Sequence, residues 1–471
     1  MSADRVKKPS RFPAGLGARL ILGSVTAIGA VAAVTAAAAL PWPGVSTPPV
    51  ALDVTPAPAE TVLACDGPLL ALGRDPQNAQ ALTVAAPSTV TSGNDQGDAP
   101  ASDALAQPTV EGEAAASRFV QLPDGKEPVS AAAASSVSVS DVDLSGFAAS
   151  ACRAPQMESW IVGGDTETGT TGILLVANPG DVDATVQITV YGVSGPTTPP
   201  GAEAVAIPPR TQVALPIAGL AGGEASPVLR ITATGAPVRA TLQSSLIRTL
   251  DPGGIDLQSA VRPATTQIIP GLRVVGAAAT TEGATTIVRL LSEQDAEVAI
   301  TVSEAGSGGA PAREPETVQA VAGSPLEVDL GGLVAGDYTV TVQSDAPVVA
   351  AVWQTTGFGK GADFAWHTAA PAVAQRTLFA VPKGSDAALS IANPSDETVT
   401  VTIARVDGTP KDIVIPAGET VTRPLTPRTV YIVDPGGAAV HAAVGFASPS
   451  AVASFALWPD AARPRPVVVY P

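Results

Sequence analysis

Histidine, cysteine and aromatic residues are scarce in this sequence. The 471-residue chain has two histidines, two cysteines and 4% aromatic residues. It contains no His-Glu-x-x-His motif, no Gly-x-Ser-x-Gly motif and no Gly-x-x-x-x-Gly-Lys loop, the patterns that position metals, nucleophiles and nucleotides. These absences favour a protein that is not an enzyme, and they predict no catalytic residues, no metal site and no cofactor.

Basic residues are few outside the N-terminus. Lysine and arginine total 26 against 43 aspartates and glutamates, which gives a net charge of −17. Residues 1–19 carry five basic residues and one aspartate, a net +4, which leaves −21 for the remainder. A polyanionic body repels phosphate backbones, so no nucleic acid is predicted as a partner.

One long hydrophobic run is present near the N-terminus. Leu20–Leu40 has 21 residues and no charged side chain, enough to span a ~30 Å hydrocarbon core as a helix. Because the basic flank precedes this run, the positive-inside rule predicts a cytoplasmic tail at 1–19, a transmembrane anchor or signal segment at 20–40, and an extracytoplasmic bulk. The alternative is a signal peptide cleaved near the alanines at 36–39. Both interpretations predict export, and the anchor predicts a single-pass cell-membrane protein in contact with lipid.

The only cysteines, Cys65 and Cys152, are predicted to form a disulfide, because paired cysteines tend to oxidise outside the cytoplasm. The sequence between them has few large apolar residues over 85–117 and 123–150. Such stretches bury too little surface to offset the entropy lost when a backbone is ordered. We therefore predict that 41–150 comprises an N-terminal strand and a low-complexity, disordered stretch that the disulfide closes into a loop.

A pattern recurs three times after residue 150. Asn178, Ser292 and Asn393 occupy equivalent positions, with aliphatic residues four and two positions before them and eight and ten positions after them. The spacing of two is typical of strands with one buried face, and Asn-Pro is typical of a tight turn. The aliphatic residues are Leu174, Val176, Val186, Ile188, Val288, Leu290, Ile300, Val302, Leu389, Ile391, Val401 and Ile403.

These repeats predict an all-β fold. Each copy holds about seven short strands in roughly 100 residues, which is typical of immunoglobulin-like or fibronectin-like β-sandwiches. We predict three tandem modules of this kind, at 151–266, 267–374 and 375–471. A β-propeller, which needs more and shorter blades, is the weaker alternative.

The stretch that follows Cys152 resembles an uncharacterised family. Residues 159–164 read Ser-Trp-Ile-Val-Gly-Gly, and Asn-Pro follows at Asn178; this arrangement is similar to an actinobacterial family of unknown function that covers about 50–471. The resemblance implies a membrane-anchored extracytoplasmic protein. Some members are encoded beside membrane glycosyltransferases and cell-wall mannose genes, which implies a membrane glycosyltransferase or another envelope protein as partner. The family has no assigned catalytic residues to carry over.

Three late tryptophans are the candidate ligand-binding residues. Trp353, Trp366 and Trp458 recur near the ends of the second and third modules, where they either line a groove or pack at module junctions. Ligand grooves combine aromatic rings with a few polar groups. We predict a non-catalytic, membrane-anchored extracytoplasmic scaffold or accessory protein that acts in cell-envelope glycan assembly. The alternatives are a carbohydrate-binding surface protein and, with less support, a cryptic glycoside-active enzyme.

Overall fold

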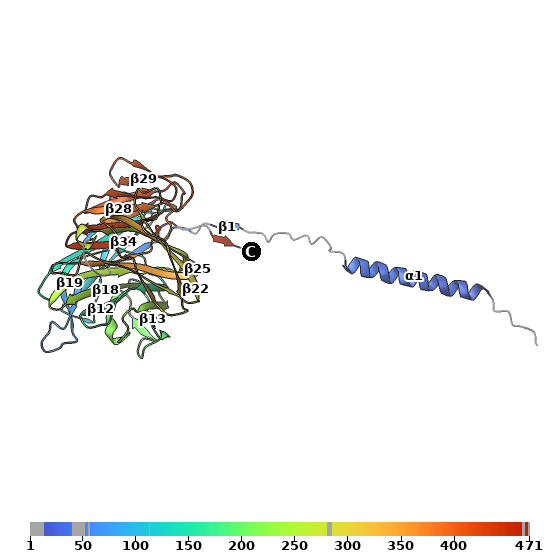
Figure 1. Ribbon diagram of the computed structural model, residues 1–471, viewed down its shortest axis with the longest axis horizontal. Helices are drawn as coiled ribbons and strands as arrows, with labels where there is room; N and C mark the ends of the chain where they lie inside the picture. The colour runs from blue at the N-terminus through green and yellow to red at the C-terminus, as the bar shows by residue number, and fades with distance from the viewer. Residues whose placement is uncertain are drawn as a thin grey trace, which may run out of the picture. The chain divides into compact units, whose positions relative to one another are not determined.

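Short strands rich in valine, threonine and alanine make up most of this protein. The computed structural model describes residues 14–39, 52–54, 57–112, 114–279, 285–463 and 467–469. It divides into two units, Met1–Thr55 with Pro466–Pro471 and Pro56–Arg465, each of which we describe by itself. The described residues are mostly strand with little helix (Figure 1), which confirms the predicted all-β class.

The smaller unit contains the longest helix among the described residues. Helix α1 spans Ala14–Ala39, and strand β1 (Leu52–Val54) pairs antiparallel with β35 (Val467–Val469). Within the described part of the chain, no helix combines the length and the hydropathy that a membrane span requires. Residues 1–13 of the predicted cytoplasmic tail lie outside the described residues, as do residues 40–51.

The prediction that the stretches 85–117 and 123–150 are disordered is wrong, because strands form in both. The strands of this region are β2 (Thr61–Ala64), β3 (Leu69–Leu72), β4 (Leu82–Ala86), β5 (Thr89–Asn94), β6 (Ala101–Ala106), β7 (Val110–Glu111), β8 (Ala115–Gln121), β9 (Ala131–Ser140) and β10 (Ser145–Cys152). Strands β9 and β10 form a hairpin, and β5 pairs with the other edge of β9. Strands β3, β4 and β7 form a separate sheet.

Small side chains can be ordered here because larger ones from elsewhere pack against them. Ala132, Ala134 and Ala149 are at most 6% exposed, and they share an apolar cluster with large residues between 373 and 457. The later part of the chain therefore supplies the apolar surface that residues 85–150 lack. The prediction from composition underestimated how much of residues 85–150 is buried, because it considered only the apolar surface of those residues themselves.

Two sheets surround the apolar core of residues 158–259. The elements here are β11 (Glu158–Val162), β12 (Thr170–Asn178), β13 (Ala184–Gly192), β14 (Gly195–Thr197), β15 (Val205–Ile207), β16 (Thr211–Pro216), the 3-10 helix η1 (Ile217–Gly219), β17 (Val228–Thr234), β18 (Arg239–Arg248) and β19 (Asp251–Ser259). One sheet has the order β11-β17-β13-β14, with β15 also paired to β13. The other has the order β19-β18-β12-β16-β6-β8-β2, so it continues into the N-terminal region. Both contribute to one buried cluster that includes Leu174, Ile188 and Ile231.

A single seven-stranded sheet contains residues 264–368. Its elements are β20 (Ala264–Val274), β21 (Thr286–Ser292), β22 (Ala296–Glu304), β23 (Glu316–Ala320), β24 (Leu326–Asp329), β25 (Gly336–Thr355) and β26 (Phe364–Thr368), with the short helix α2 (Gly276–Ala279) after β20. The 20-residue strand β25 connects this sheet, because β20, β21, β22 and β26 all pair with it. The first half of β25 pairs mainly with β20 and β22, and the second half pairs with β21 and β26.

Two four-stranded sheets contain residues 377–456. Their strands are β27 (Thr377–Val381), β28 (Ala387–Ala392), β29 (Val399–Arg405), β30 (Lys411–Ile415), β31 (Thr420–Pro424), β32 (Thr429–Asp434), β33 (His441–Ser448) and β34 (Ala451–Ala456). The strand orders are β27-β32-β29-β30 and β31-β28-β33-β34. Both sheets contribute to one apolar cluster, which includes Phe379, Leu389 and Phe446.

The aliphatic residues of the repeat are buried, apart from the half-buried Ile403. The turns also match between copies. The residue two positions after Asn178, Ser292 and Asn393 donates its backbone N–H to that side chain, at 3.0, 3.1 and 3.1 Å. Both asparagines also donate from Nδ2 to the carbonyl four positions on. The Asn-Pro motif therefore has a structural role as a turn.

Four hairpins place their last strands side by side in the larger unit. Strands β10, β19, β26 and β34 each pair with the strand directly before them. They also contact one another in the cyclic order β10-β19-β26-β34. Strand β34 therefore lies beside β10 although they are distant in sequence. Figure 1 labels β19 and β34, two strands of this ring. This ring of four strands joins the N-terminal region to the three later parts of the chain.

Asp363, directly before β26, links the other three strands of this ring. Its carboxylate accepts backbone N–H groups from Phe147 in β10 at 3.0 Å, Ile255 in β19 at 3.1 Å and Val452 in β34 at 3.2 Å. The residue is fully buried. Burial raises its pKa, and the backbone donors oppose that shift. Gly254 leaves room for the carboxylate, because a Cβ there would lie 2.7 Å from Asp363 Oδ1.

Candidate functional site

The structure brings Trp353 and Trp366 together and places Trp458 elsewhere. Trp353 of β25 and Trp366 of β26 are cross-strand partners, so their side chains lie on the same face of the sheet. Both line a cavity of about 280 Å³, which we call the tryptophan cavity. This volume is near the lower end of the range for small-molecule sites, roughly 300 Å³.

The two rings differ in how far a ligand can reach them. Trp366 is 5% exposed, whereas Trp353 is only partly buried. The ring of Phe364, which also lines the cavity, lies 6.3 Å from that of Trp353. Trp353 therefore presents the accessible aromatic surface, and the other two rings support it.

Two arginines lie against these rings. Arg289 is buried and binds Glu327 through Nε at 2.9 Å and Nη2 at 2.7 Å, while its guanidinium lies 4.8 Å from the Trp366 ring centre. Arg248 is half-buried, with its guanidinium 5.9 Å from the Trp353 ring centre, and burial lowers its pKa. Arg289 is thus fixed by an ion pair, whereas no ion pair holds Arg248 within the described residues.

The remaining polar groups of the cavity include acceptors and hydroxyls. Asp165 accepts the backbone N–H of Glu167 at 2.7 Å, and burial raises the pKa of Asp165. Ser244 is buried, and its Oγ has no hydrogen-bond partner in the described structure. The cavity therefore combines aromatic rings, carboxylates, guanidinium groups and hydroxyls from several strands.

A buried carboxylate lies directly behind Trp366. Asp256 Oδ2 accepts the backbone N–H of Trp366 at 2.9 Å, and the residue is fully buried. Burial raises the pKa of Asp256 to about 7. This group therefore changes charge near neutral pH, next to the strand that carries Trp366.

We expect Asp256 to make the protein less stable as pH rises from about 4 to about 7. The native state keeps its proton up to a pKa of about 7, whereas an unfolded aspartate loses it near 4. Unfolding therefore releases a proton in this window, and the free energy of unfolding falls by on the order of 4 kcal/mol. Urea unfolding at several pH values should show this slope in the wild type and a shallower one in Asp256→Asn. Equal slopes in the two proteins would contradict the assignment.

Trp458 lies in the wall of a second cavity, of about 240 Å³. Arg153 and Arg262 line the same cavity, and their guanidinium carbons lie 3.4 and 4.6 Å from the Trp458 ring centre. We call it the Arg153 cavity. The three candidate tryptophans are thus divided between two separate sites.

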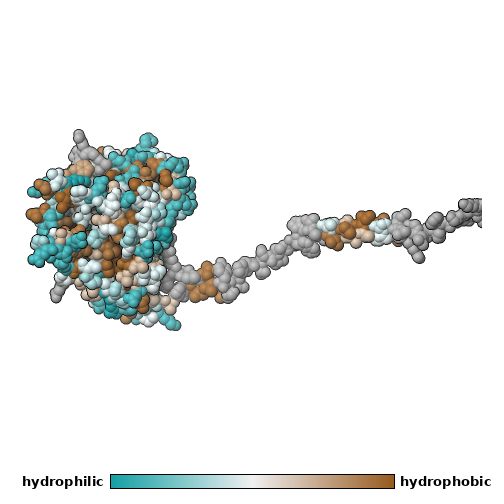
Figure 2. Space-filling model, turned by 90° about the horizontal axis from the view of Figure 1, so that it is seen from below, coloured by the Kyte–Doolittle hydropathy of each residue, from teal (hydrophilic) through white to brown (hydrophobic). Residues whose placement is uncertain are grey.

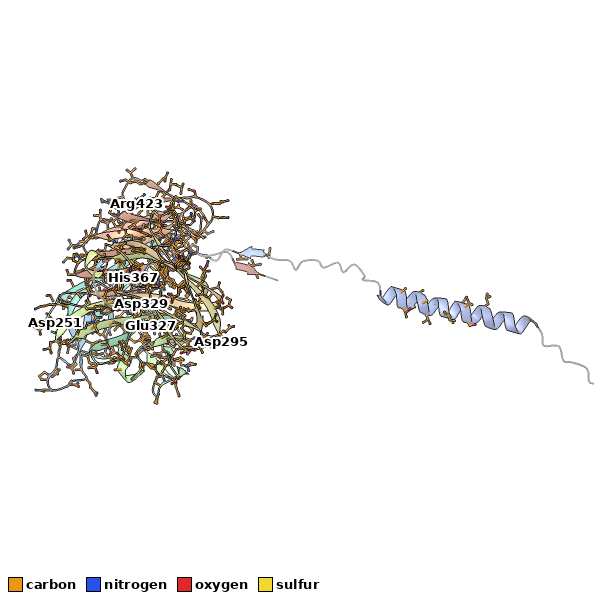
Figure 3. The ribbon with its side chains drawn as sticks, viewed as in Figure 1. Asp251, Asp295, Glu327, Asp329, His367 and Arg423 are labelled. Carbon is orange, nitrogen blue, oxygen red and sulfur yellow. A yellow bond between two sulfur atoms is a disulfide. The ribbon has the colours of Figure 1, made fainter. Side chains whose placement is uncertain are left out.

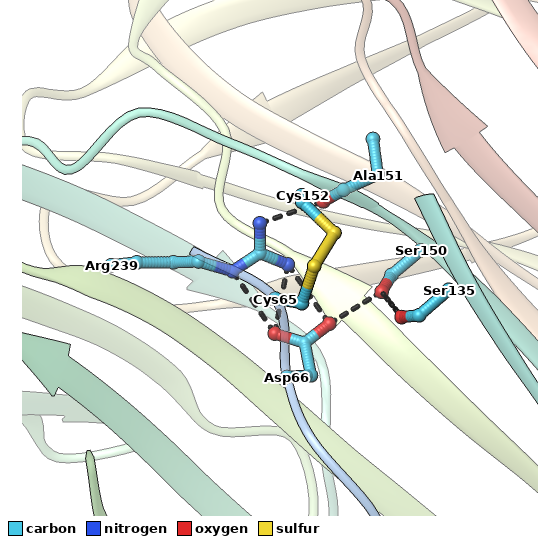
Figure 4. Close-up of a disulfide and its surroundings, with 7 residues drawn as sticks. All are labelled: Cys65, Asp66, Ser135, Ser150, Ala151, Cys152 and Arg239. Carbon is cyan, nitrogen blue, oxygen red and sulfur yellow. Dashed lines mark hydrogen bonds and ion pairs between the residues drawn. A yellow bond between two sulfur atoms is a disulfide. The ribbon is translucent and has the colours of Figure 1, made fainter. Parts of the chain in front are cut away.

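The disulfide between Cys65 and Cys152 is present, which confirms that prediction. Figure 4 shows a buried ion pair beside it. Asp66 accepts hydrogen bonds from Arg239 Nε at 3.0 Å and Nη2 at 2.8 Å, and Ser150 Oγ donates to the same carboxylate. Arg239 lies in β18 and Ser150 in β10. The disulfide closes the N-terminal region on itself, and the ion pair ties that region to β18.

Neither histidine lines the tryptophan cavity or the Arg153 cavity. His367 (labelled in Figure 3) is buried, its Nε2 lies 2.9 Å from Gln354 Oε1, and burial lowers its pKa to about 3. His441 Nδ1 lies 2.6 Å from the carbonyl oxygen of Ala370. No group of three or more histidine, cysteine or acidic side chains is arranged to hold a metal ion in the described ranges.

Sequence reasoning missed the charged residues behind the rings. Arg289 stands between Val288 and Leu290, and Asp256 stands between Ile255 and Leu257. A charged residue inside an aliphatic strand rarely becomes buried without a specific partner. A charged residue within an aliphatic strand was therefore the sequence signal that could have identified Arg289 and Asp256.

The described residues form an all-β fold with two partly open cavities that contain aromatic rings. The chain belongs to a family of unknown function (DUF5719), which matches residues 90–426. The match confirms the resemblance to a family of unknown function, over a shorter span than 50–471. It includes Trp353, Trp366, Asp256 and Asp363, and it ends before Trp458. No curated protein matches the chain.

Proposed function

We propose that this protein is a non-catalytic binding protein whose tryptophan cavity holds a neutral saccharide. The observation that carries the proposal is the accessible ring of Trp353, set in a cavity that also contains Asp165 and Arg248. A sugar ring has an apolar C–H face and an edge of hydroxyls. The face packs on an indole, and the hydroxyls bond to carboxylate and guanidinium groups.

The charges of the cavity favour a neutral ligand. Three acidic residues (Asp165, Glu167 and Glu327) and two arginines (Arg248 and Arg289) line it, so the charges nearly cancel. One of these arginines is already bound to Glu327. A strongly charged saccharide would therefore gain little Coulomb energy here, whereas a neutral one uses groups of both signs as hydrogen-bond partners.

Trp353→Ala should weaken saccharide binding about tenfold, because the lost ring contact contributes roughly 1–1.5 kcal/mol. Calorimetric titration of the full-length chain with neutral oligosaccharides would measure the change. Trp353→Phe should recover part of the affinity, and Trp458→Phe, at the other cavity, serves as the matched control. Unchanged affinity in Trp353→Ala would refute the assignment of the site.

Binding without turnover is the second part of the proposal. Glu327 is held by Arg289, so it is poorly placed to move as a general base. We expect no new reducing ends from any neutral oligosaccharide that binds. Release of reducing ends that Asp165→Asn abolishes would instead indicate a glycoside-active enzyme.

Export and membrane anchoring remain part of this proposal. Their support is the uncharged run Leu20–Leu40 after the basic residues 1–19, together with the disulfide, which is typical of oxidising compartments. A reporter fused after residue 50 would test export, and the N-terminal sequence of the mature protein would separate an anchor from a cleaved signal peptide.

A scaffold or accessory role in cell-envelope glycan assembly is compatible with saccharide binding. The family resemblance supports a membrane glycosyltransferase or another envelope protein as partner, and crosslinking in intact cells would test it. We also infer that 151–266, 267–374 and 375–471 are tandem modules of an immunoglobulin-like or fibronectin-like kind. The matching turns at Asn178 and Asn393 support this relationship.

A further inference from the structure

The Arg153 cavity contains a buried cation that is incompletely paired. Arg153 is 9% exposed, and Nη1 donates to the carbonyl oxygen of Ala260 at 3.0 Å. Its Nη2 has no hydrogen-bond partner among the described residues. A buried guanidinium usually pairs with an acid, because taking a charge out of water is unfavourable unless it is paired.

The charges around Arg153 do not neutralise it. Burial lowers the pKa of Arg153, and the neighbouring cations Arg239 and Arg262 lower it further, while Asp66 acts in the opposite direction. That carboxylate already binds Arg239 through two hydrogen bonds. Arg153 therefore lies near two further arginines, and the aspartate that favours its charged form is already paired with one of them, Arg239.

Trp458 contacts both a buried and an exposed arginine of this charge cluster. The Arg153 guanidinium lies 3.4 Å from its ring centre, and that of the exposed Arg262 lies 4.6 Å away. Both arginines line the cavity together with the indole. One cation is thus deep in the wall and the other is reachable from solvent.

Among the described residues that line the cavity, Asp460 is the one acid, and it already has partners. Asp460 Oδ1 accepts the backbone N–H of Ala462 at 2.9 Å, and Oδ2 lies 3.6 Å from Arg463 Nε. The rest of the wall is largely apolar and includes Leu63, Leu378, Phe379, Phe455 and Leu457. The cavity therefore combines two arginines with an apolar surface.

We propose that the Arg153 cavity binds a small amphiphilic oxyanion, a carboxylate or a phosphate monoester carried on an apolar group. Arg153 and Arg262 bind the oxyanion, since guanidinium groups match the geometry of carboxylate and phosphate. The apolar group packs against the leucine and phenylalanine side chains of the wall. This site is separate from the tryptophan cavity, and the inference does not rest on saccharide binding.

The test is calorimetric titration of the full-length chain with three probes of equal chain length: hexyl phosphate, hexanoate and hexanol. We expect the two anions to bind and hexanol not to bind. Arg262→Gln should weaken anion binding roughly tenfold to a hundredfold, the effect of losing one charged hydrogen bond. The exposed residue Arg262 is the variant of choice because its loss leaves the buried packing intact. Arg423→Gln, an exposed arginine outside this cavity, is the matched control and should bind as the wild type does.

Three results would overturn the proposal. Hexanol that binds as tightly as hexanoate would show that the arginines do not recognise the headgroup. Wild-type affinity in Arg262→Gln would place the anion elsewhere. Inorganic phosphate that binds as tightly as hexyl phosphate would show that the apolar wall takes no part. Tryptophan fluorescence gives a second readout, because a change on hexyl phosphate binding should disappear in Trp458→Phe.

Discussion

Replacement of Asp363 by alanine is expected to destabilise the larger unit by several kcal/mol. The variant removes the acceptor of three buried N–H groups, those of Phe147, Ile255 and Val452. Each buried donor that loses its partner costs about 1–3 kcal/mol. Because the three donors belong to three different strands of the ring, the loss should also loosen the contacts among those strands. Urea unfolding, followed by circular dichroism, would measure the change.

Asp329→Ala is the matched control for this experiment. Asp329, which is labelled in Figure 3, also accepts a backbone N–H, that of Gly331 at 2.8 Å, but it is exposed. Water replaces an exposed acceptor, so the control should lose less than about 1 kcal/mol. If Asp363→Ala were as stable as this control, Asp363 would have no role in joining the strands.

The second large effect is expected at the ion pair beside the disulfide. Arg239→Met leaves Asp66, which is 1% exposed, without its cation. Loss of one partner from a buried pair typically destabilises by about 3–5 kcal/mol. The double variant with Asp66→Asn should recover part of the loss, because the buried carboxylate charge that had lost its cation is removed as well. Thermal unfolding of the wild type and of the two variants would show the difference.

A surface pair provides the comparison. Arg313 and Glu316 form an ion pair of 3.3 Å in which both side chains are at least 30% exposed. Arg313→Met should change stability by less than about 1 kcal/mol. If Arg239→Met lost no more stability than Arg313→Met, the buried pair would not tie the N-terminal region to β18.

The strands on either side of the repeated turns could be predicted from local sequence patterns. The aliphatic spacing around Asn178 and Asn393 marks strands on either side of a turn, and the side-chain hydrogen bonds of both asparagines confirm that turn. Alternating burial and turn chemistry are properties of neighbouring residues. They can therefore be read from the sequence alone.

The N-terminal region could not be predicted in the same way. Its order depends on contacts with distant segments, such as Ala149 against residues between 373 and 457 and Asp66 against Arg239. Small side chains give little local indication of a buried strand, because the stabilisation comes from the larger side chains that pack against them. The pairing of Cys65 with Cys152 was the one long-range contact that composition revealed.

The candidate site was predictable only in part. Tryptophan is rare enough in this chain to identify Trp353, Trp366 and Trp458 as candidates. Which of them share a cavity depends on the register of β25 with β26 and on how the four hairpins meet. Arg153 and Arg262 were missed because their significance depends on their distance from Trp458, which no sequence pattern expresses.

Saturation-transfer NMR with neutral oligosaccharides tests the central claim most directly, because it reports which protons of the sugar contact the protein. We predict that the wild-type chain transfers saturation mainly to the C–H protons on one face of a sugar ring, and that Trp353→Ala loses this signal while Trp458→Phe keeps it. No transfer to any neutral saccharide, or equal transfer in the wild type and in Trp353→Ala, would contradict the proposal that the tryptophan cavity is a saccharide site.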